Sequence, residues 1–155
     1  MTLDHLEFHP CRADEAPGSE LAAAMVAEME PLYGRIDVPE APSASAGEMW
    51  PPHGSFLVAW KDDEPVACGG IKGLGGGACE IKRMYVLPAL RGKGVAGALL
   101  TALENEARAQ GFTVARLDTG AKQPHAQRIY EAAGYEPIGN FNNNPFASFW
   151  GEKAL

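Results

Sequence analysis

The stretch from Glu80 to Leu103 constrains the fold most, because its residue pattern changes sharply in the middle. Residues 81–86 are mostly β-branched, aromatic or long, and Pro88 follows them, which predicts a strand that ends there. From Val95 onward the apolar residues recur at helical spacing, which predicts a helix. The segment between them, 91–94, reads Arg-Gly-Lys-Gly and suits neither regular structure. The sequence therefore predicts a strand, a glycine-rich turn and a helix in direct succession.

The glycine-rich turn has the properties of a phosphate-binding site. Gly92 and Gly94 have no Cβ, so a ligand can approach the main chain closely. The first N–H groups of the following helix have no internal partner, and the helix dipole adds positive potential. Arg91 and Lys93 add full positive charges. A phosphate or pyrophosphate is the expected ligand, and a tight turn with two solvated cations is the alternative.

The residues before this stretch predict an antiparallel meander. Apolar runs are separated by short turns, of which Asp62-Asp63-Glu64 is the clearest. The expected strands are residues 6–12, 56–60, 65–71 and 78–86. A helix is expected between the first two strands, with Ser19 as its N-cap and Tyr33-Gly34 as its end. Its apolar stripe includes Met25 and Met29 and is expected to be core rather than a ligand surface.

The residues after the stretch predict a parallel partner for its strand. A helix to about Gln110 and a strand at 113–118 complete a strand–helix–strand unit, whose two strands should be parallel. The remaining expected elements are a helix from Pro124 to Gly134 and strands at 135–138 and 146–152. The expected fold is a single α/β domain over residues 1–155, built on a mixed α+β sheet with helices on both faces.

Composition narrows the class of protein. The 155 residues carry a formal net charge of −7, which argues against a general nucleic-acid binder. The sequence has no apolar run of roughly 18 residues, so no membrane span is expected. Three cysteines cannot all pair, and they show no metal-ligand spacing. The simplest interpretation is a reduced, cytoplasmic protein without a metal.

A dinucleotide-binding interpretation competes for the glycine-rich turn. Gly92-x-Gly94-x-x-Gly97 matches that fingerprint, and Asp118 follows about twenty residues later. In a dinucleotide fold, however, the glycines follow the first strand almost directly, whereas here an antiparallel meander precedes them. The residues after Gly97 are also too few for the rest of such a fold. The context therefore disfavours this interpretation.

Two motifs resemble those of the GNAT (general N-acetyltransferase) superfamily. Arg91-Gly92-Lys93-Gly94-Val95-Ala96 is similar to the family's acyl-CoA pyrophosphate loop, Arg/Gln-x-x-Gly-x-Gly/Ala. Gln123-x-x-Ala126-x-x-Ile129-Tyr130-x-x-x-Gly134-Tyr135 resembles a second family motif, Asn-x-x-Ala-x-x-Leu-Tyr-x-x-x-Gly-Phe, with Gln at the position of the usual Asn. The motifs occur in the family's order and spacing. Residues 80–86 and 117–120 also resemble the corresponding segments of a small bacterial single-domain subgroup of the family.

The resemblance implies a fold and an activity. The family fold has an antiparallel N-terminal meander, a central parallel strand pair splayed around acyl-CoA, and helices on both faces. The implied protein is an acyl-CoA-dependent N-acetyltransferase. It would move an acetyl group from acetyl-CoA to a primary amine by direct transfer in a ternary complex. A non-catalytic acyl-CoA-binding regulatory module is the alternative, and a homodimer is left open.

The resemblance also implies site residues. Glu80 is the expected general base, with a strand residue paired to Lys82 as the alternative, and Tyr130 is the expected general acid, with a core aromatic as the alternative. The strand from Glu80 to Val86 spans about 20 Å, which brings Glu80 near the thiol end of the pantetheine arm. The residues expected to bind the cofactor are Met84, Tyr85, Val86, Leu87, Arg91, Gly92, Lys93, Gly94, Val95, Ala96, Gln123, Ala126 and Tyr130.

The acceptor site is the least constrained part of the sequence. Residues 35–54 form a long segment rich in proline, serine and alanine, and such segments often line binding sites. The residues expected to contact the acceptor are Tyr33, Glu48, Trp50, Asn142 and Asn143, with Asn144 beside them. These mixed polar and aromatic side chains leave both a small-molecule amine and a peptide amine open. Cys79 as an acyl carrier is a weaker alternative, because it should point away from the face that carries Glu80.

Overall fold

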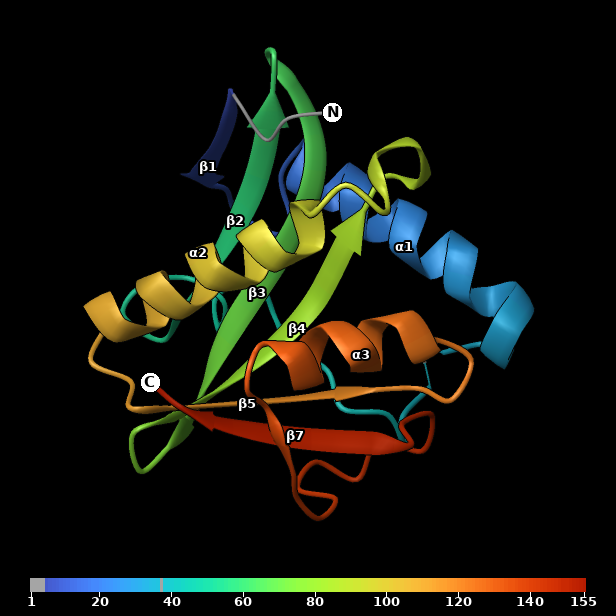
Figure 1. The fold of residues 1–155 in the computed structure, drawn as a ribbon, viewed down its shortest axis with the longest axis vertical. Helices are drawn as coiled ribbons and strands as arrows, with labels where there is room; N and C mark the ends of the chain where they lie inside the picture. Colours follow the sequence, from blue (N-terminus) through green and yellow to red (C-terminus); the bar gives the residue numbers. More distant parts are fainter. Residues whose placement is uncertain (1–4, 37) are drawn as a thin grey trace.

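The computed structural model describes residues 5–36 and 38–155, which form a seven-stranded mixed sheet with helices on both faces (Figure 1). The strands are β1 (Leu6–Pro10), β2 (Gly54–Lys61), β3 (Glu64–Gly75), β4 (Ala78–Val86), β5 (Val114–Thr119), β6 (Glu136–Pro137) and β7 (Phe149–Ala154). The helices are α1 (Gly18–Tyr33), α2 (Val95–Ala109) and α3 (Pro124–Ala132), with a short 3-10 turn, η1 (Pro88–Leu90). The strand order is β1-β2-β3-β4-β5-β7-β6. The α/β fold expected from the sequence is confirmed.

The antiparallel meander expected from the sequence comprises β1 to β4. Asp62 and Asp63 form the β2–β3 turn with left-handed φ values of 48° and 66°, which short polar side chains tolerate best after glycine. The register between β3 and β4 shifts between Cys68 and Gly70, and Arg83 on β4 has a φ of 58° at this bulge. A bulge bends its strand and increases the local twist, so the last residues of β4 are aimed away from the parallel direction.

The predicted parallel pair of β4 and β5 is present, and the two strands separate along their length. The described ladder joins only residues 78–80 of β4 to residues 114–116 of β5. Beyond Glu80, β4 continues to Val86, and no described strand pairs with it on the β5 side. Figure 1 shows the strands diverging from the lower edge of the sheet. This leaves backbone polar groups of β4 facing a gap inside the molecule, where a ligand can pair with them.

Helices on both faces bury two apolar clusters, and β2 alternates between them. Leu57 and Ala59 pack in the cluster that α2 covers. Phe56 and Val58 pack in the cluster that α1 covers. Figure 1 shows α2 and α3 on the same side of the sheet. The helix layers therefore fix both sides of the gap between β4 and β5.

The start of α1 differs from the expectation. Ser19 was expected to be the N-cap, but α1 begins at Gly18, and Pro17 precedes it without a side-chain cap. The Ser19 N–H donates to the backbone oxygen of Glu15 at 2.9 Å, so a turn of main chain satisfies the helix end instead. Gly18 fits closely there, because a Cβ would lie 3.1 Å from the ring of Phe56.

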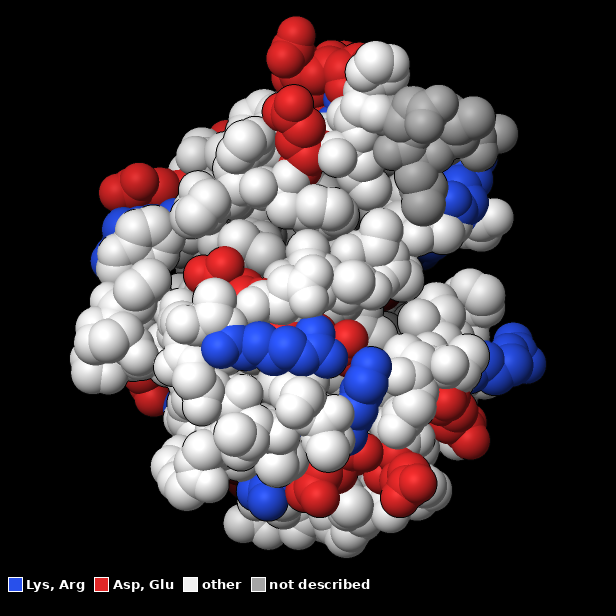
Figure 2. Space-filling model, turned by 60° about the vertical axis from the view of Figure 1, so that its left-hand side comes forward, with Lys and Arg blue, Asp and Glu red and all other residues white. Residues whose placement is uncertain are grey.

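Charge is dispersed on the face drawn in Figure 2. Basic side chains (blue) lie among acidic and uncharged ones and do not gather into one broad patch on this face. The chain has a net charge of −7, and this face carries no concentrated basic patch. It therefore lacks the features of a surface that binds a nucleic-acid backbone.

Candidate active site

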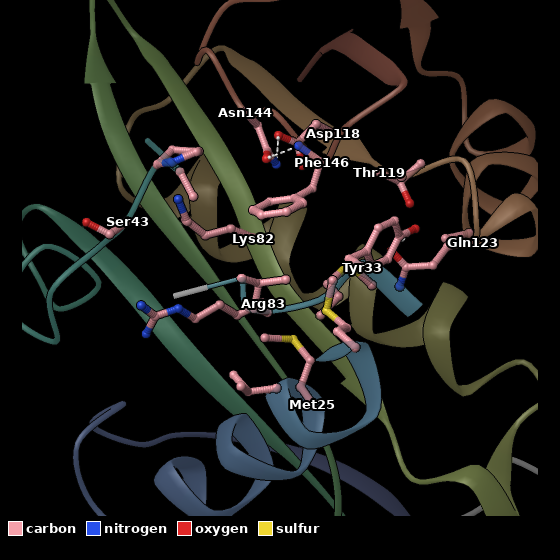
Figure 3. A pocket seen from close by; sticks show the side chains of 18 of the residues that line it. Met25, Tyr33, Ser43, Lys82, Arg83, Asp118, Thr119, Gln123, Asn144 and Phe146 are labelled. Carbon is pink, nitrogen blue, oxygen red and sulfur yellow. Dashed lines mark hydrogen bonds between the residues drawn. The ribbon is translucent and has the colours of Figure 1, made fainter. Parts of the chain in front are cut away.

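Two adjacent cavities open along the separated edge of β4. We call the first the sheet cavity; it has a volume of about 540 Å³ and lies between α1, residues 38–43, β4 and the end of β5 (Figure 3). We call the second the loop groove; it has a volume of about 1060 Å³ and lies between the end of β4, residues 90–97 and α3. The residues that line both are Met25, Met29, Met84, Gln123, Ala126 and Tyr130. A ligand in the loop groove can therefore reach a ligand in the sheet cavity.

Met25 and Met29 were expected to be core, and this prediction holds only in part: both are half-buried, and Met25 packs against an apolar cluster. Leu21, earlier in the stripe, is buried as expected, but the two methionines line both cavities. The reason is that the pairing of β4 and β5 ends at Glu80, so this part of α1 covers a gap rather than a continuous sheet. Flexible, polarisable methionine side chains are well suited to line a cavity that receives a ligand.

The glycine-rich turn has the geometry of an anion site. Gly92 and Gly94 have left-handed φ values of 76° and 85°, and Gly94 is the N-cap residue of α2. This helix has no side-chain cap and no acidic residue in its first turn. Gly94, Val95 and Ala96 line the loop groove. The free N–H groups and the positive end of the helix dipole are therefore available to an anionic group in the groove.

Arg91, which was expected to add a positive charge at the glycine-rich turn, forms an ion pair with a carboxylate. Its guanidinium donates to both carboxylate oxygens of Glu28 on α1, at 2.7 and 2.6 Å, and its Nε donates to the Val86 oxygen at 3.0 Å. It also lies 5.5 Å from the ring centroid of Tyr85. Arg91 lowers the pKa of Glu28 through this bidentate contact. The pair thus joins α1 to the glycine-rich turn across the loop groove, which both residues line.

Most of the expected cofactor residues line the loop groove. Those that do are Met84, Tyr85, Val86, Arg91, Gly92, Gly94, Val95, Ala96, Gln123, Ala126 and Tyr130. Lys93 is exposed and does not line it. Leu87 does not line it either, because its N–H donates to the Val66 oxygen and its own oxygen accepts from Leu90. The backbone groups of Leu87 are therefore used within the protein.

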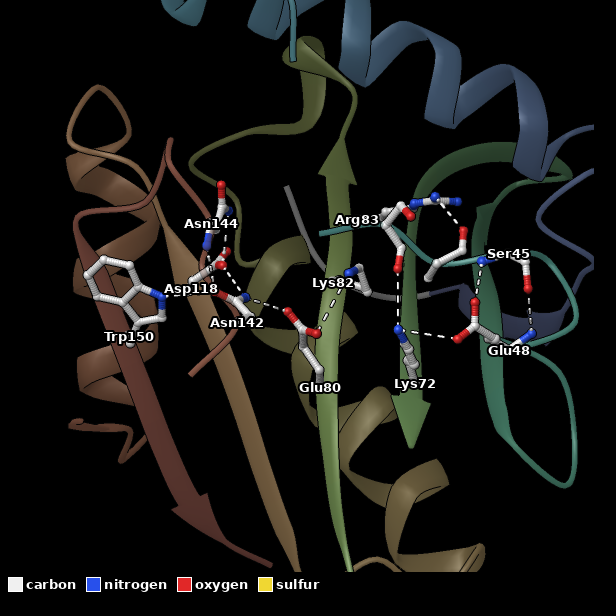
Figure 4. Close-up of polar contacts among 12 residues, drawn as sticks. Ser45, Glu48, Lys72, Glu80, Lys82, Arg83, Asp118, Asn142, Asn144 and Trp150 are labelled. Atoms are coloured by element: carbon white, nitrogen blue, oxygen red, sulfur yellow. Dashed lines mark hydrogen bonds and ion pairs between the residues drawn. The ribbon is translucent and has the colours of Figure 1, made fainter. Parts of the chain in front are cut away.

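Glu80 belongs to a polar cluster in the sheet cavity (Figure 4). It is only 4% exposed, and its Oε1 lies 3.6 Å from Nζ of Lys82. Nδ2 of Asn142 donates to Oε2 of Glu80 at 2.9 Å and to Oδ2 of Asp118 at 2.6 Å. Trp150 donates to Oδ1 of Asn142, which fixes the direction of this amide. The pairing of Glu80 with Lys82 therefore occurs, but at a cavity wall rather than on an exposed strand face.

Tyr130 lies where the two cavities meet. Its hydroxyl is 3.9 Å from Sδ of Met84 on β4, and its ring packs edge-on against Tyr135. Burial, together with the negative charge of Asp118, raises the pKa of Tyr130 to about 12. The hydroxyl therefore stays protonated at neutral pH and can donate a proton.

The acceptor residues expected from the sequence divide between the sheet cavity and the surface. Tyr33 and Asn144 line the cavity, and Asn142 contacts Glu80. Asn143 lies in a turn with a φ of 57° and does not line it. Tyr33 is held by its bond to the Lys122 N–H, and a Cβ on Gly120 would lie 2.2 Å from its hydroxyl.

Glu48 and Trp50 do not line the sheet cavity, contrary to the expectation. Glu48 accepts the Ser45 N–H and pairs with Lys72 at 3.2 Å, and these contacts lower its pKa to about 2. Trp50 lies against Arg12. The reason is that Met49 between them is 0% exposed and packs into the core, which turns its two neighbours away from the cavity.

Sequence reasoning missed several residues of the sheet cavity. Asp118 was noted only for the dinucleotide fingerprint, and Arg83 and Phe146 were not singled out, yet all three line the cavity. The available signal for Asp118 was its place near the carboxyl end of the predicted parallel strand, where ligands of open sheets bind. No local signal marks Arg83, because its exposure to the cavity depends on the bulge in β4.

Comparison with known proteins identifies the family. Residues 22–135 match the model of the acetyltransferase (GNAT) family. The chain belongs to this family. It is 31% identical over 148 residues to an IAA acetyltransferase of Azospirillum brasilense, which covers 92% of this chain and 96% of the relative.

Crystal structures of GNAT proteins share its fold. An acetyltransferase of the GNAT family from Staphylococcus aureus matches with a TM-score of 0.80 at 16% identity, over 97% of this chain and 99% of that one. A GNAT acetyltransferase from Elizabethkingia anophelis with acetyl-CoA bound matches with a TM-score of 0.68 at 16% identity, over 98% and 99% of the two chains. This GNAT protein is accordingly an N-acetyltransferase that uses acetyl-CoA. No helix in the described part of the chain combines the length and apolar character needed to cross a membrane.

Proposed function

We propose that this GNAT enzyme transfers the acetyl group of acetyl-CoA directly to a primary amine, with both substrates bound at once. The observation that supports this most is the meeting of the loop groove and the sheet cavity at Tyr130 and Met84. A cofactor in the groove and an amine in the cavity would then have their reacting atoms side by side. We further propose that residues 1–155 act as one domain, because a single sheet contributes residues to both cavities.

The loop groove is the proposed cofactor site. The pyrophosphate binds the N–H groups of Gly94, Val95 and Ala96 at the start of α2. Gln123, the N-cap of α3, and Ala126 border the groove from the other side. The pantetheine arm runs along the open edge of β4 toward Glu80 and pairs with backbone groups that β5 does not reach. Both ends of the cofactor are thereby held by main-chain groups.

The chemistry then follows from three sets of atoms. Glu80 removes a proton from the bound ammonium group, directly or through water, and the neutral nitrogen attacks the thioester carbonyl carbon. A backbone N–H from Met84, Tyr85 or Val86 stabilises the oxyanion. The C–S bond breaks as the C–N bond is retained, and Tyr130 donates its proton to the leaving thiolate. The nitrogen then loses its second proton, which returns through water to Tyr130, and Glu80 releases its own proton to the solvent.

An amine screen tests this function. Purified protein is mixed with acetyl-CoA and a panel of small amines, amino acids and peptides, and both thiol release and the acetylated product are measured. We expect at least one amine to be acetylated in proportion to thiol release. If acetyl-CoA raises the melting temperature but no amine is acetylated, the regulatory-module alternative replaces the enzyme.

Tyr130→Phe should lower kcat about 10- to 100-fold, at or below the lower end of general-acid effects, because a thiolate is already a moderate leaving group. Acetyl-CoA affinity should change little, since the ring remains. Tyr135→Phe is the matched control: Tyr135 lines neither cavity, and its hydroxyl donates at 2.8 Å to Glu104 at the far wall of the loop groove, so its loss should lower the melting temperature but not kcat. An unchanged kcat in Tyr130→Phe would remove the general-acid role.

A further inference from the structure

Four charged side chains line the sheet cavity, and two of them lack an ionic partner. Glu80 and Lys82 neutralise each other at 3.6 Å. Arg83 and Asp118 remain, and neither has an oppositely charged group within ion-pair distance among the described residues. The cavity therefore presents one unpaired cation and one unpaired anion to whatever it binds (Figure 3).

Arg83 is a half-buried guanidinium with most of its hydrogen-bonding capacity unused. Within the described chain its side chain makes one hydrogen bond, from NH2 to the Ala44 oxygen at 2.7 Å, although a guanidinium has five donors. Burial without a carboxylate partner lowers the pKa of Arg83. An unpaired charge that is partly removed from water is costly to the fold, and an anionic ligand would offset that cost.

Asp118 is held in place by hydrogen bonds to only one of its two carboxylate oxygens. Its Oδ2 accepts from Nδ2 of Asn142 at 2.6 Å and from Nδ2 of Asn144 at 3.0 Å. The oxygens of these two amides accept from Trp150 and from the Phe146 N–H, so each amide is fixed with its NH2 group toward Asp118. Oδ1 accepts no hydrogen bond from a described residue, and it remains available to a cationic group.

The two unpaired charges lie on different sides of an apolar space. Figure 3 shows Asp118 beside Asn144 at one side, and Arg83 extending to the opposite side toward Ser43. Apolar side chains in the other walls of the cavity include Phe146 and Met25. A ligand that satisfies both charges must therefore carry a cationic and an anionic group, joined by a largely apolar body.

We infer that the acceptor of this enzyme is a zwitterionic amine, whose ammonium group binds Asp118 and whose carboxylate binds Arg83. This inference rests on the proposed acetyl transfer to an amine in the sheet cavity. Asp118 positions the ammonium group beside Glu80, to which the shared Asn142 amide links it. Glu80 then takes the proton, and the nitrogen attacks acetyl-CoA. Amino carboxylates whose two charged groups are separated by an apolar chain form the substrate class.

Matched amines test this inference in the wild-type protein. 5-Aminopentanoate and pentylamine have similar chain lengths and amine basicities, but only the first carries a carboxylate. We expect kcat/KM for 5-aminopentanoate to exceed that for pentylamine by about 10- to 100-fold, the size of a charge-assisted contact. Two further substrates are measured. Leucine tests a shorter separation between the two charges, and 3-aminopropylphosphonate tests a different anionic group.

Substitutions of Arg83 test whether this residue causes the preference for an amine that carries a carboxylate. Arg83→Gln should lower kcat/KM for 5-aminopentanoate to the level of pentylamine and leave pentylamine nearly unchanged, while Arg83→Lys should keep part of the preference. Arg116→Gln is the matched control, because Arg116 pairs with Glu152 at 2.7 Å outside the cavity, and it should keep the full preference. Melting temperatures of all variants confirm that they fold.

Two different failures can be told apart. If pentylamine is acetylated as well as 5-aminopentanoate, or if Arg83→Gln lowers both rates equally, the zwitterion inference is wrong while acetyl transfer stands. If no amine in any arm is acetylated although acetyl-CoA binds, the proposed function itself is wrong.

Discussion

Gly94→Glu should raise the dissociation constant of acetyl-CoA by at least about 100-fold, because it removes two or more charge-assisted bonds to phosphate, each of which contributes roughly 1.5–3 kcal/mol. Gly94 is the N-cap of α2 with a φ of 85°, a conformation that strains any residue with a Cβ. The new carboxylate would itself occupy the positive end of the helix and repel the pyrophosphate. Isothermal titration calorimetry measures the change directly.

Gly111→Glu is the matched control for Gly94→Glu. Gly111 follows the other end of α2 with a φ of 90° and lines neither cavity, so the substitution brings similar backbone strain and the same charge. We expect a lower melting temperature and an unchanged acetyl-CoA affinity. Retained acetyl-CoA binding by a folded Gly94→Glu protein would show that the phosphates bind elsewhere than at the start of α2.

Glu80→Gln should lower kcat/KM about 10²- to 10⁴-fold, the range expected for loss of a general base. The glutamine keeps the shape of the side chain and an oxygen that can accept from Asn142, but it cannot take a proton. Raising the pH supplies more of the neutral amine from solution, so the deficit should shrink at high pH. Initial rates of thiol release from pH 6 to 10, over a range of concentrations of an amine from the screen, measure both effects.

Glu152→Gln controls for loss of a strand carboxylate. Glu152 on β7 pairs with Arg116 at 2.7 Å and lines neither cavity, so its substitution should leave kcat/KM within about twofold of the wild type. Removal of Glu80 also leaves Lys82 without its partner, and the double variant with Lys82→Met separates that effect. Equal activity of Glu80→Gln and wild type at pH 7 would transfer the base role to another group.

The fold was predictable because its signals are local and periodic. The change from strand to helical spacing around residues 91–94 predicted β4, the turn and α2, and the turn residues Asp62 and Asp63 predicted the hairpin. The parallel pairing of β4 with β5 followed from the length of the connection between them. These features depend on residues that are near one another in sequence.

The acceptor side was less predictable because it depends on long-range packing. Whether Glu48 and Trp50 line the cavity depends on the burial of Met49, which no local sequence pattern predicts. The pairing of Arg91 with Glu28 joins residues 63 positions apart. The role of Arg83 likewise arises from a bulge, so its place in the cavity required the three-dimensional structure.

Direct transfer at the junction of the two cavities is tested by measuring the intact mass of the protein. The enzyme is incubated with acetyl-CoA alone and then with an amine that the screen identifies, and the masses of protein and product are followed. Direct transfer predicts no acetylated protein in either case, with one acetylated amine for each thiol released. Stoichiometric acetylation of the protein before the amine is added, on Cys79 or any other residue, followed by transfer of that acetyl group to the amine, would show a covalent intermediate and exclude direct transfer.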